Sequence, residues 1–423
     1  MNQNVEYGLH VNPGMEPPVD RRRFVQLVSG GVAVGLAGCV GDDGENGDDD
    51  SPTDDGSSDD GTESTSSEGL VYAFAPNTIA IIDPEAGEIV DEITEGIDGN
   101  GWGDPRVTSD HEQLFVIEDT LGQVFVIDTE SREVVSEIDI GPDPTHMYHP
   151  TDDEMWAHSD EEGAFYVIDT TSHDVVDVVE SGLEAEGHGK LLYHPDFGSK
   201  AYATNVNDPA ALIIDVAEYE RTGYVELGDD GGTHYKAYSP QNGLAYFEYG
   251  DTTAVVDVET DEIVDELDFS GGMYLTPDEE LLGVLDGDVV RFLDVTDEES
   301  EEIGSVDVGD GPDALRYYDA DGTRYGFTAN TMNDQAAVID IDDLEVVETL
   351  EIGDIERPDD APFLHRTGVA GDGYFITPAE ADGTVAVIDM DALELLEQVD
   401  VEEGVDTVQY VGDSGVGYTG AIR

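Results

Sequence analysis

An internal repeat restricts the possible folds of this chain more than any other feature of its sequence. An apolar run that ends in Ile-Asp, Val-Asp or Leu-Asp occurs again and again, and successive copies are 37 to 49 residues apart. The marks are Ile82-Asp83, Ile127-Asp128, Ile168-Asp169, Ile214-Asp215, Val256-Asp257, Leu293-Asp294, Ile339-Asp340 and Ile388-Asp389. A repeat of this period indicates one supersecondary unit copied along the chain.

The repeat units share one order of β-type segments. In the unit that contains Ile214, an alternating run closes on Tyr193-His194-Pro195, a β-rich run follows at 201–205, and the Ile-Asp run comes next. A turn and one more alternating run complete each unit, as at 133–138. Segments of this length and alternation, separated by turn residues, are typical of strands. Four strands at this spacing match one blade of a β-propeller.

The units resemble the YVTN-type β-propeller repeat over essentially all of residues 70–423. We therefore expect an all-β propeller with eight blades of four antiparallel strands. Seven blades remain an alternative, because residues 71–73 and 417–419 can both serve as the same strand where the ring closes. The run 406–410 is expected to supply the innermost strand of the first blade. The resemblance indicates a fold and leaves the function open.

The charge of the chain is extreme. It has 101 acidic side chains against 15 basic ones, which gives a net charge of -86. Such a charge makes the compact state repel itself in dilute buffer, whereas molar salt screens the repulsion to a few ångströms. We therefore expect a halophilic protein of haloarchaeal origin. Nucleic acid and anionic membrane surfaces are poor partners for this acidic surface.

The N-terminal residues 1–38 have the features of an export signal. Arg21-Arg22-Arg23-Phe24-Val25 fits the twin-arginine pattern, and the apolar stretch that follows is too short for a permanent membrane span. Leu36-Ala37-Gly38-Cys39 matches a lipobox, and Cys39 is the sole cysteine. We expect a twin-arginine lipoprotein signal peptide with Cys39 as the lipidation site. The mature protein is then extracellular and attached to the cell membrane by its lipid.

Residues 39–69 form the next segment. They are mostly Gly, Asp, Glu, Ser and Thr and contain almost no apolar side chains. Such a segment cannot bury enough surface to offset its chain entropy, so we expect a disordered acidic linker. The sequence thus predicts three parts, which are the signal peptide 1–38, the lipid-anchored linker 39–69 and the propeller 70–423.

Histidines open the innermost strands of three consecutive units. The segments are Pro144-Thr145-His146-Met147, Gly187-His188-Gly189-Lys190 and Gly232-Thr233-His234-Tyr235. We expect their side chains to converge near the mouth of the central channel, with His158 as the cross-strand partner of His146. Four imidazoles suit tetrahedral zinc, so the predicted metal ligands are His146, His158, His188 and His234. The alternative is that these are ordinary surface histidines.

A second pattern overlaps the first. Counting back four residues from the Pro, or its equivalent, that closes each innermost strand gives Arg106, His146, Leu191, Lys236, Met273, Arg316 and Arg366. Lys190 lies beside this position, so the few basic residues of the chain gather here. One interpretation is an anion-binding channel formed by Arg106, Lys236, Arg316 and Arg366, because Arg presents fixed donors to carboxylate or phosphate. The other is that they neutralise carboxylates buried between blades.

The segments around His146, His188 and His234 are also similar to those of zinc-chaperone propellers that accompany zinc ABC transporters. This resemblance implies a metallochaperone with an ABC transporter component as its partner, although the chain lacks a His-rich loading stretch. Two alternatives remain open, which are a cell-surface interaction scaffold without chemistry and a carrier or enzyme that holds an anionic cofactor such as haem d1. No Ser-His-Asp order or carboxylate pair stands out, so a non-enzymatic role is favoured.

Overall fold

The structure is a computed structural model that describes residues 69–183, 186–229, 231–320, 322–358, 364–412 and 414. All of them belong to the compact unit Ser64–Arg423. The expected twin-arginine segment, Cys39 and the linker up to residue 68 lie outside the described residues. Within the described part of the chain, no helix is long and apolar enough to cross a membrane.

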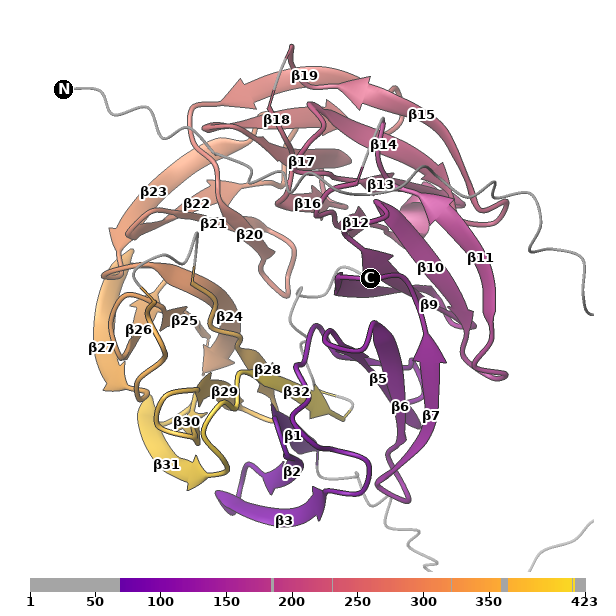
Figure 1. The fold of residues 1–423 in the computed structure, drawn as a ribbon. Helices are drawn as coiled ribbons and strands as arrows, with labels where there is room; N and C mark the ends of the chain where they lie inside the picture. The colour runs from indigo at the N-terminus through magenta and orange to yellow at the C-terminus, as the bar shows by residue number, and fades with distance from the viewer. Residues whose placement is uncertain are drawn as a thin grey trace, which may run out of the picture. The chain divides into compact units, whose positions relative to one another are not determined.

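Eight four-stranded antiparallel sheets make up this unit, arranged as the blades of a β-propeller around one axis (Figure 1). We number the blades 1 to 8 and give their strands from the axis outwards. Blade 1 has β32 (Thr407–Val411), β1 (Leu70–Ala75), β2 (Thr78–Asp83) and β3 (Glu88–Ile93). Blade 2 has β4 (Arg106–Val107), β5 (Gln113–Glu118), β6 (Gln123–Asp128) and β7 (Glu133–Asp139). Blade 3 has β8 (Pro144–Thr151), β9 (Glu154–Ser159), β10 (Ala164–Asp169) and β11 (Val175–Glu180). Blade 4 has β12 (Leu191–Leu192), β13 (Lys200–Ala203), β14 (Ala210–Asp215) and β15 (Glu220–Glu226).

The second half of the ring repeats the arrangement. Blade 5 has β16 (Lys236–Ser239), β17 (Leu244–Tyr249), β18 (Thr252–Asp257) and β19 (Glu262–Leu267). Blade 6 has β20 (Gly272–Leu275), β21 (Leu281–Asp286), β22 (Val289–Asp294) and β23 (Glu301–Asp307). Blade 7 has β24 (Pro312–Ala320), β25 (Thr323–Asn330), β26 (Gln335–Asp340) and β27 (Glu345–Glu351). Blade 8 has β28 (Val369–Gly371), β29 (Tyr374–Ala379), β30 (Thr384–Asp389) and β31 (Glu394–Asp400), and the described chain also contains a short 3₁₀ helix at Pro195–Phe197.

The Ile-Asp marks of the sequence have one structural role. Each mark ends the third strand of a blade, where its apolar residue is buried and its Asp begins the turn to the outermost strand. In blade 2, for example, the backbone N–H of Ser131 donates to Asp128 Oδ1 at 2.7 Å, and Arg132 N–H donates to the Asp128 carbonyl at 2.8 Å. An Asp side chain that accepts from the backbone a few residues later is a standard way to fix a tight turn. The mark recurs because each blade makes this turn.

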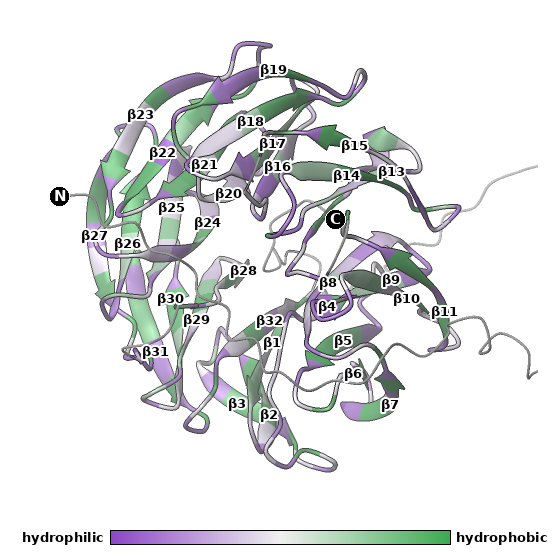
Figure 2. Ribbon diagram, turned by 45° about the horizontal axis from the view of Figure 1, so that its top comes forward, coloured by the Kyte–Doolittle hydropathy of each residue, from purple (hydrophilic) through white to green (hydrophobic). Residues whose placement is uncertain are grey.

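The hydrophobic core lies in layers between adjacent blades. One layer joins blades 3 and 4 and includes Trp156, Phe165, Ala203 and Leu212, all fully buried. In Figure 2, hydrophobic residues colour much of the middle strands β25 and β26, whereas the outer strands are mixed. Strands buried on both faces read as continuous apolar runs, and this explains why the second and third strands of each unit are the most apolar segments.

The ring closes by pairing the two ends of the propeller. β32 pairs with β1 in antiparallel register, with Val71 opposite Tyr410 and Ala73 opposite Val408. In Figure 1 the yellow β32 lies beside the indigo β1. The expectation that the C-terminal run supplies the innermost strand of the first blade is therefore confirmed. The number of blades is eight, so the seven-blade alternative is wrong.

Candidate metal centre

Three histidines from consecutive blades meet near the propeller axis. His146 lies in β8 of blade 3, His188 precedes β12 of blade 4, and His234 precedes β16 of blade 5. The Nε2 atom of His188 is 3.0 Å from Nε2 of His146 and 2.9 Å from Nε2 of His234. One nitrogen from each ring falls within 4.8 Å of the other two. The expected convergence of the three inner-strand openings is therefore present in the structure.

Two carboxylates orient the imidazoles from behind. Asp104 Oδ2 is 2.6 Å from Nδ1 of His146, and Asp160 Oδ2 is 2.7 Å from Nδ1 of His188. A carboxylate accepts a hydrogen bond from Nδ1–H, and in a neutral imidazole this leaves Nε2 with a lone pair and no proton. Carboxylates that fix the ring orientation and tautomer in this way are typical of metal-ligating histidines.

The surroundings favour the neutral form of His146 and His234. Burial lowers the pKa of His146 and of His234 well below the ordinary value of histidine, and the positive charge of Lys190 lowers both further. His146 is 7% exposed, whereas the side chain of His188 is 28% exposed. Only the neutral form of imidazole can bind a metal ion, so these pKa shifts favour binding.

The donor set fits a metal ion. When Nδ1–H of His146 and of His188 face carboxylates, the Nε2 lone pairs of both rings point at one another over 3.0 Å. Lone pairs repel at that distance unless a proton or a cation lies between them. Three imidazole nitrogens with no fourth donor in the group match a site that keeps one coordination position open for another ligand.

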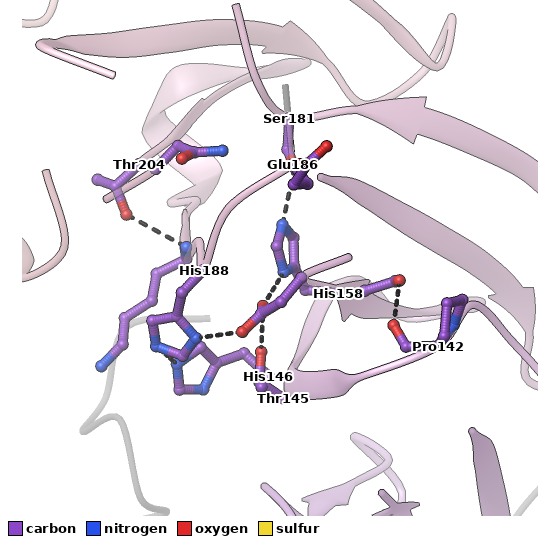
Figure 3. Close-up of polar contacts among 12 residues, drawn as sticks. Pro142, Thr145, His146, His158, Ser181, Glu186, His188 and Thr204 are labelled. Carbon is purple, nitrogen blue, oxygen red and sulfur yellow. Dashed lines mark hydrogen bonds and ion pairs between the residues drawn. The ribbon is translucent and has the colours of Figure 1, made fainter. Parts of the chain in front are cut away.

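His158, the fourth predicted ligand, lies apart from the other three. Its side chain is fully buried, with Nδ1 at 2.8 Å from Asp160 Oδ1 and Nε2 at 2.8 Å from Ser181 Oγ. Figure 3 shows His158 pointing away from the neighbouring rings of His146 and His188. Both of its nitrogens are therefore engaged, and its contact with the group runs through the Asp160 carboxylate.

The expected cross-strand pairing of His146 with His158 is wrong. The register between β8 and β9 shifts, so that Pro144 pairs with Ser159 and Met147 pairs with Ala157. Two residues of β8, Thr145 and His146, therefore oppose the single residue His158. Such a bulge changes the direction of a side chain. Here His146 shares its place opposite His158 with Thr145, so the two histidines form no regular cross-strand pair, and the His146 ring lies beside that of His188.

Asp160 connects the three histidines His146, His188 and His234, called the metal group below, to the residues that support them. It accepts hydrogen bonds from Thr145 Oγ1 at 2.7 Å, from Nδ1 of His158 and from Nδ1 of His188 (Figure 3). Burial alone would raise the pKa of Asp160, but the hydrogen bonds from His158 and His188 hold this pKa well below its usual range. The carboxylate therefore stays ionised, and His158 acts as a positioning residue for it.

Close packing fixes the loop that carries His188. A Cβ atom at Gly189 would lie 2.5 Å from the carbonyl oxygen of Thr204 and 3.0 Å from Nε2 of His158. The first distance is shorter than any real contact of a Cβ atom. Only glycine therefore fits between His188 and Lys190, and the loop is held against β13 and β9.

The four predicted anion-binding residues occupy different surroundings. Arg366 is 1% exposed and donates to four backbone carbonyls, those of Asn330, Ile352, Gly353 and Pro378. Arg316 is also buried and donates to the carbonyl of Leu315 at 2.8 Å. Both guanidinium groups thus contact backbone carbonyls of blades 7 and 8.

Arg106 and Lys236 lie nearer the histidines. Arg106 Nε donates to the carbonyl of Met147 at 2.9 Å, and its guanidinium carbon is 5.8 Å from the ring centre of Tyr148. Lys236 Nζ lies 5.4 Å from the centre of the same ring. The basic positions around the axis therefore divide into a pair beside the metal group and a pair that supports the backbone.

The sequence did not identify Asp104 and Asp160 as part of the site. Each lies two residues from a residue that the pattern did single out, Arg106 and His158 respectively. The chain has 101 acidic residues, so an Asp at such a distance carries no signal. Only the structure, in which they contact His146 and His188, distinguishes Asp104 and Asp160 from the other acidic residues.

Comparisons with known proteins agree on the fold. No protein-family model matches the sequence, and no curated protein is significantly similar to it. Dihydro-heme d1 dehydrogenase NirN in complex with DHE aligns with 79% of this chain and 73% of its own, with a TM-score of 0.63 and 14% identity. Apo AztD from Citrobacter koseri aligns with 82% of this chain and 98% of its own, with a TM-score of 0.58 and 13% identity.

A third solved structure, a functionally unknown protein from Desulfotomaculum acetoxidans, covers 71% of this chain and 99% of its own at a TM-score of 0.53 and 17% identity. Identities this low show the fold alone. The chain is an eight-bladed β-propeller, and its own residues have to carry any statement about function.

Proposed function

We propose that this chain binds one zinc ion through His146, His188 and His234, and that it is a lipid-anchored extracellular metallochaperone. The observation that carries the proposal is the convergence of three Nε2 atoms whose tautomers are set by Asp104 and Asp160. Zinc favours three or four nitrogen donors in tetrahedral geometry. A Zn²⁺ ion seated here would replace the repulsion between the facing lone pairs with three coordinate bonds.

The accessibility of the site supports a role in transfer. His146 is buried, whereas His234 is partly exposed and the side chain of His188 is 28% exposed, so two ligands of the three are reachable from outside. An ion can exchange through these exposed ligands and the open fourth position without unfolding of the blades. The similarity of the three histidine segments to zinc-chaperone propellers supports the same role. We propose an ABC transporter component as the acceptor.

The proposed anchor and location rest on the sequence alone. The twin-arginine segment at 21–25 and the lipobox that ends at Cys39 support export and lipid attachment. Replacement of Cys39 by Ser should release the protein from the membrane fraction into the medium. If the Cys39→Ser protein stays in the membrane fraction, the proposed lipid anchor is wrong.

The decisive experiment is the metal content of the protein purified in high salt. We expect one zinc per chain, and loss of that zinc when His146, His188 and His234 are all replaced by Ala. The control replaces two histidines outside the group, His173 and His194, and should keep the zinc. Circular dichroism of both variants checks that the propeller is intact. A wild-type protein that stays metal-free after incubation with zinc contradicts the proposal and favours an interaction scaffold.

A second candidate is a carrier of an anionic cofactor such as haem d1. The observation in its favour is that Lys190 and Lys236 lie over tyrosine rings that neighbour His234 and His146, and that Arg106 donates to the residue after His146, so one ligand could contact an imidazole and basic side chains together. The absorbance spectrum of the purified protein distinguishes the candidates. A visible chromophore lost in the triple histidine variant supports the cofactor carrier, whereas a colourless zinc protein contradicts it.

A further inference from the structure

Two lysine side chains near the metal group lack an acidic partner. Lys190 is 6% exposed, and its Nζ lies 4.7 Å from the ring centre of Tyr235. Lys236 is partly buried, and its Nζ lies over the ring of Tyr148. Within the described residues, neither ammonium group donates a hydrogen bond or forms an ion pair. An ammonium group has three donors, and leaving them unused inside a protein is costly.

The third lysine of the chain shows that this arrangement is unusual here. Lys200 Nζ forms an ion pair with Asp261 at 2.8 Å, at a distance from the metal group. Acidic residues outnumber basic ones by 101 to 15, so partners for a lysine are abundant almost everywhere. Lys190 and Lys236 therefore differ from Lys200, because neither of them forms an ion pair with a carboxylate of the described residues.

The two lysines lie close to each other and to the histidines. Lys190 Nζ lies over the ring of Tyr235, whose centre is 4.4 Å from that of His234. Lys236 Nζ lies over the ring of Tyr148, whose centre is 6.4 Å from that of His146, and Arg106 donates to the carbonyl of Met147, the next residue after His146. The three basic side chains and the three imidazoles thus share one small region.

A metal ion alone would make this region too positive. Asp104, Asp160, Asp313 and Glu248 are the carboxylates that face this region, and none of them forms an ion pair with Lys190. Their four negative charges are fewer than the five positive charges of Zn²⁺ and three basic side chains. The basic side chains repel the ion by Coulomb's law, most strongly where water is excluded. A negatively charged ligand that enters with the ion reduces this repulsion and gives the ammonium groups an acceptor.

We propose that a small oxyanion, such as carbonate or a carboxylate, binds between the ammonium groups of Lys190 and Lys236 and occupies the open coordination position of the metal held by His146, His188 and His234. The inference rests on the proposed zinc site. Oxygen atoms of such an anion accept charge-assisted hydrogen bonds from ammonium groups, and one oxygen can complete a tetrahedral zinc site. Metal and anion then bind cooperatively, because each reduces the electrostatic cost of the other.

The test measures zinc affinity of the full chain by chelator competition, at constant ionic strength in sodium nitrate. Bicarbonate, acetate, phosphate and chloride are added in turn. We expect at least one of the three oxyanions to tighten zinc binding by about tenfold or more, a typical size for coupling between two sites. In the double variant Lys190→Met and Lys236→Met, this dependence should disappear while one zinc per chain remains. The control Lys200→Met should behave as wild type.

Cobalt(II) gives a second readout that does not depend on affinity. The visible absorption of Co²⁺ bound to the wild type should change when the active oxyanion is added, because a ligand of the metal has changed. The double lysine variant should show no such change.

The outcomes separate this inference from the proposed function. If wild type binds no zinc under any condition, the proposed zinc site itself is wrong. If zinc binds with equal affinity in every salt and the cobalt spectrum does not respond, the zinc site stands and the anion inference is overturned. A response to chloride alone also overturns it, since the fourth ligand would then be a halide.

Discussion

Two sides of the propeller axis carry basic residues at or beside the same position of the innermost strand. The contacts of these residues differ between the two sides. In blade 8, the Arg366 guanidinium donates to four backbone carbonyls and is itself a part of the core. In blades 4 and 5, Lys190 and Lys236 donate no hydrogen bond to the described residues and lie over tyrosine rings. The first arrangement stabilises the fold, and the second leaves donors available for a ligand. Position in a repeat therefore does not determine the role of a side chain.

The largest expected difference between the two sides is in stability. Arg366→Met would leave several buried carbonyls without a donor, and each unsatisfied buried group costs about 1–3 kcal/mol. We expect a loss of roughly 3–5 kcal/mol in the free energy of unfolding. Lys236→Met removes no hydrogen bond and should change it by less than about 1 kcal/mol. Denaturant titrations at constant salt measure both, and equal losses would contradict the proposed division.

The next difference concerns metal binding. His188→Ala removes the central imidazole of the group, so zinc affinity should fall by more than about 100-fold, beyond what loss of a supporting residue costs. His194→Ala removes an imidazole outside the group, whose Nδ1 is 3.4 Å from Asp196, and should leave zinc affinity unchanged. Chelator competition on both variants provides the comparison. Similar losses in the two would mean that the ion binds elsewhere.

A smaller effect is expected for the carboxylates behind the rings. Asp160→Asn keeps the size of the side chain but removes the charge that holds the Nδ1 protons of His158 and His188. Supporting groups of this kind typically contribute about 10- to 100-fold to metal affinity. The matched variant is Asp91→Asn, which alters a surface carboxylate paired with Arg132 and should leave zinc affinity as in wild type. An Asp160→Asn protein with unchanged affinity would show that the tautomer of His188 is fixed by other contacts.

The smallest effect should depend on pH and lies at the ring closure in blade 8. Burial alone would raise the pKa of Asp372, but hydrogen bonds from Ser414, Tyr410 and the backbone of Gly69 lower it below the ordinary value of 3.8. The folded state therefore favours the ionised form. Its stabilising contribution is present above pH 3.8 and is lost as the pH falls through the lower folded-state value.

Asp372→Asn should accordingly be slightly less stable than wild type near neutral pH, with the difference vanishing in acid. Thermal unfolding of the two proteins between about pH 3 and pH 7 measures this contribution. A difference that does not depend on pH would mean that the shape of the side chain matters there, and not its charge.

The fold could be predicted from the sequence because its main signal is repeated. The Asp of each mark begins the turn to the outermost strand in all eight blades, so an error at one blade does not affect the interpretation of the others. The site could be predicted only in part. His146, His188 and His234 were found because they share one level of three consecutive blades. Their meeting follows from the blade geometry and needs no knowledge of rotamers.

Three features of the site could not be read in the same way. The bulge in β8 has no signal in residues 144–147. The sequence therefore predicts a regular pair of His146 and His158 that the register of the structure does not contain. Asp104 and Asp160 are hidden among acidic residues that have no such role. Arg366 and Lys236 occupy the same repeat position, and their different roles can be recognised only from their contacts in the structure.

The pairing of β32 with β1 has a consequence for how the chain is made. Synthesis produces β1 first and β32 last, so the inner edge of blade 1 stays unpaired until residues 407–411 are available. An unpaired strand edge is a template for association with other chains. A ribosome-bound or truncated propeller of this sequence therefore presents an open edge, and its completion removes a route to aggregation as well as closing the ring.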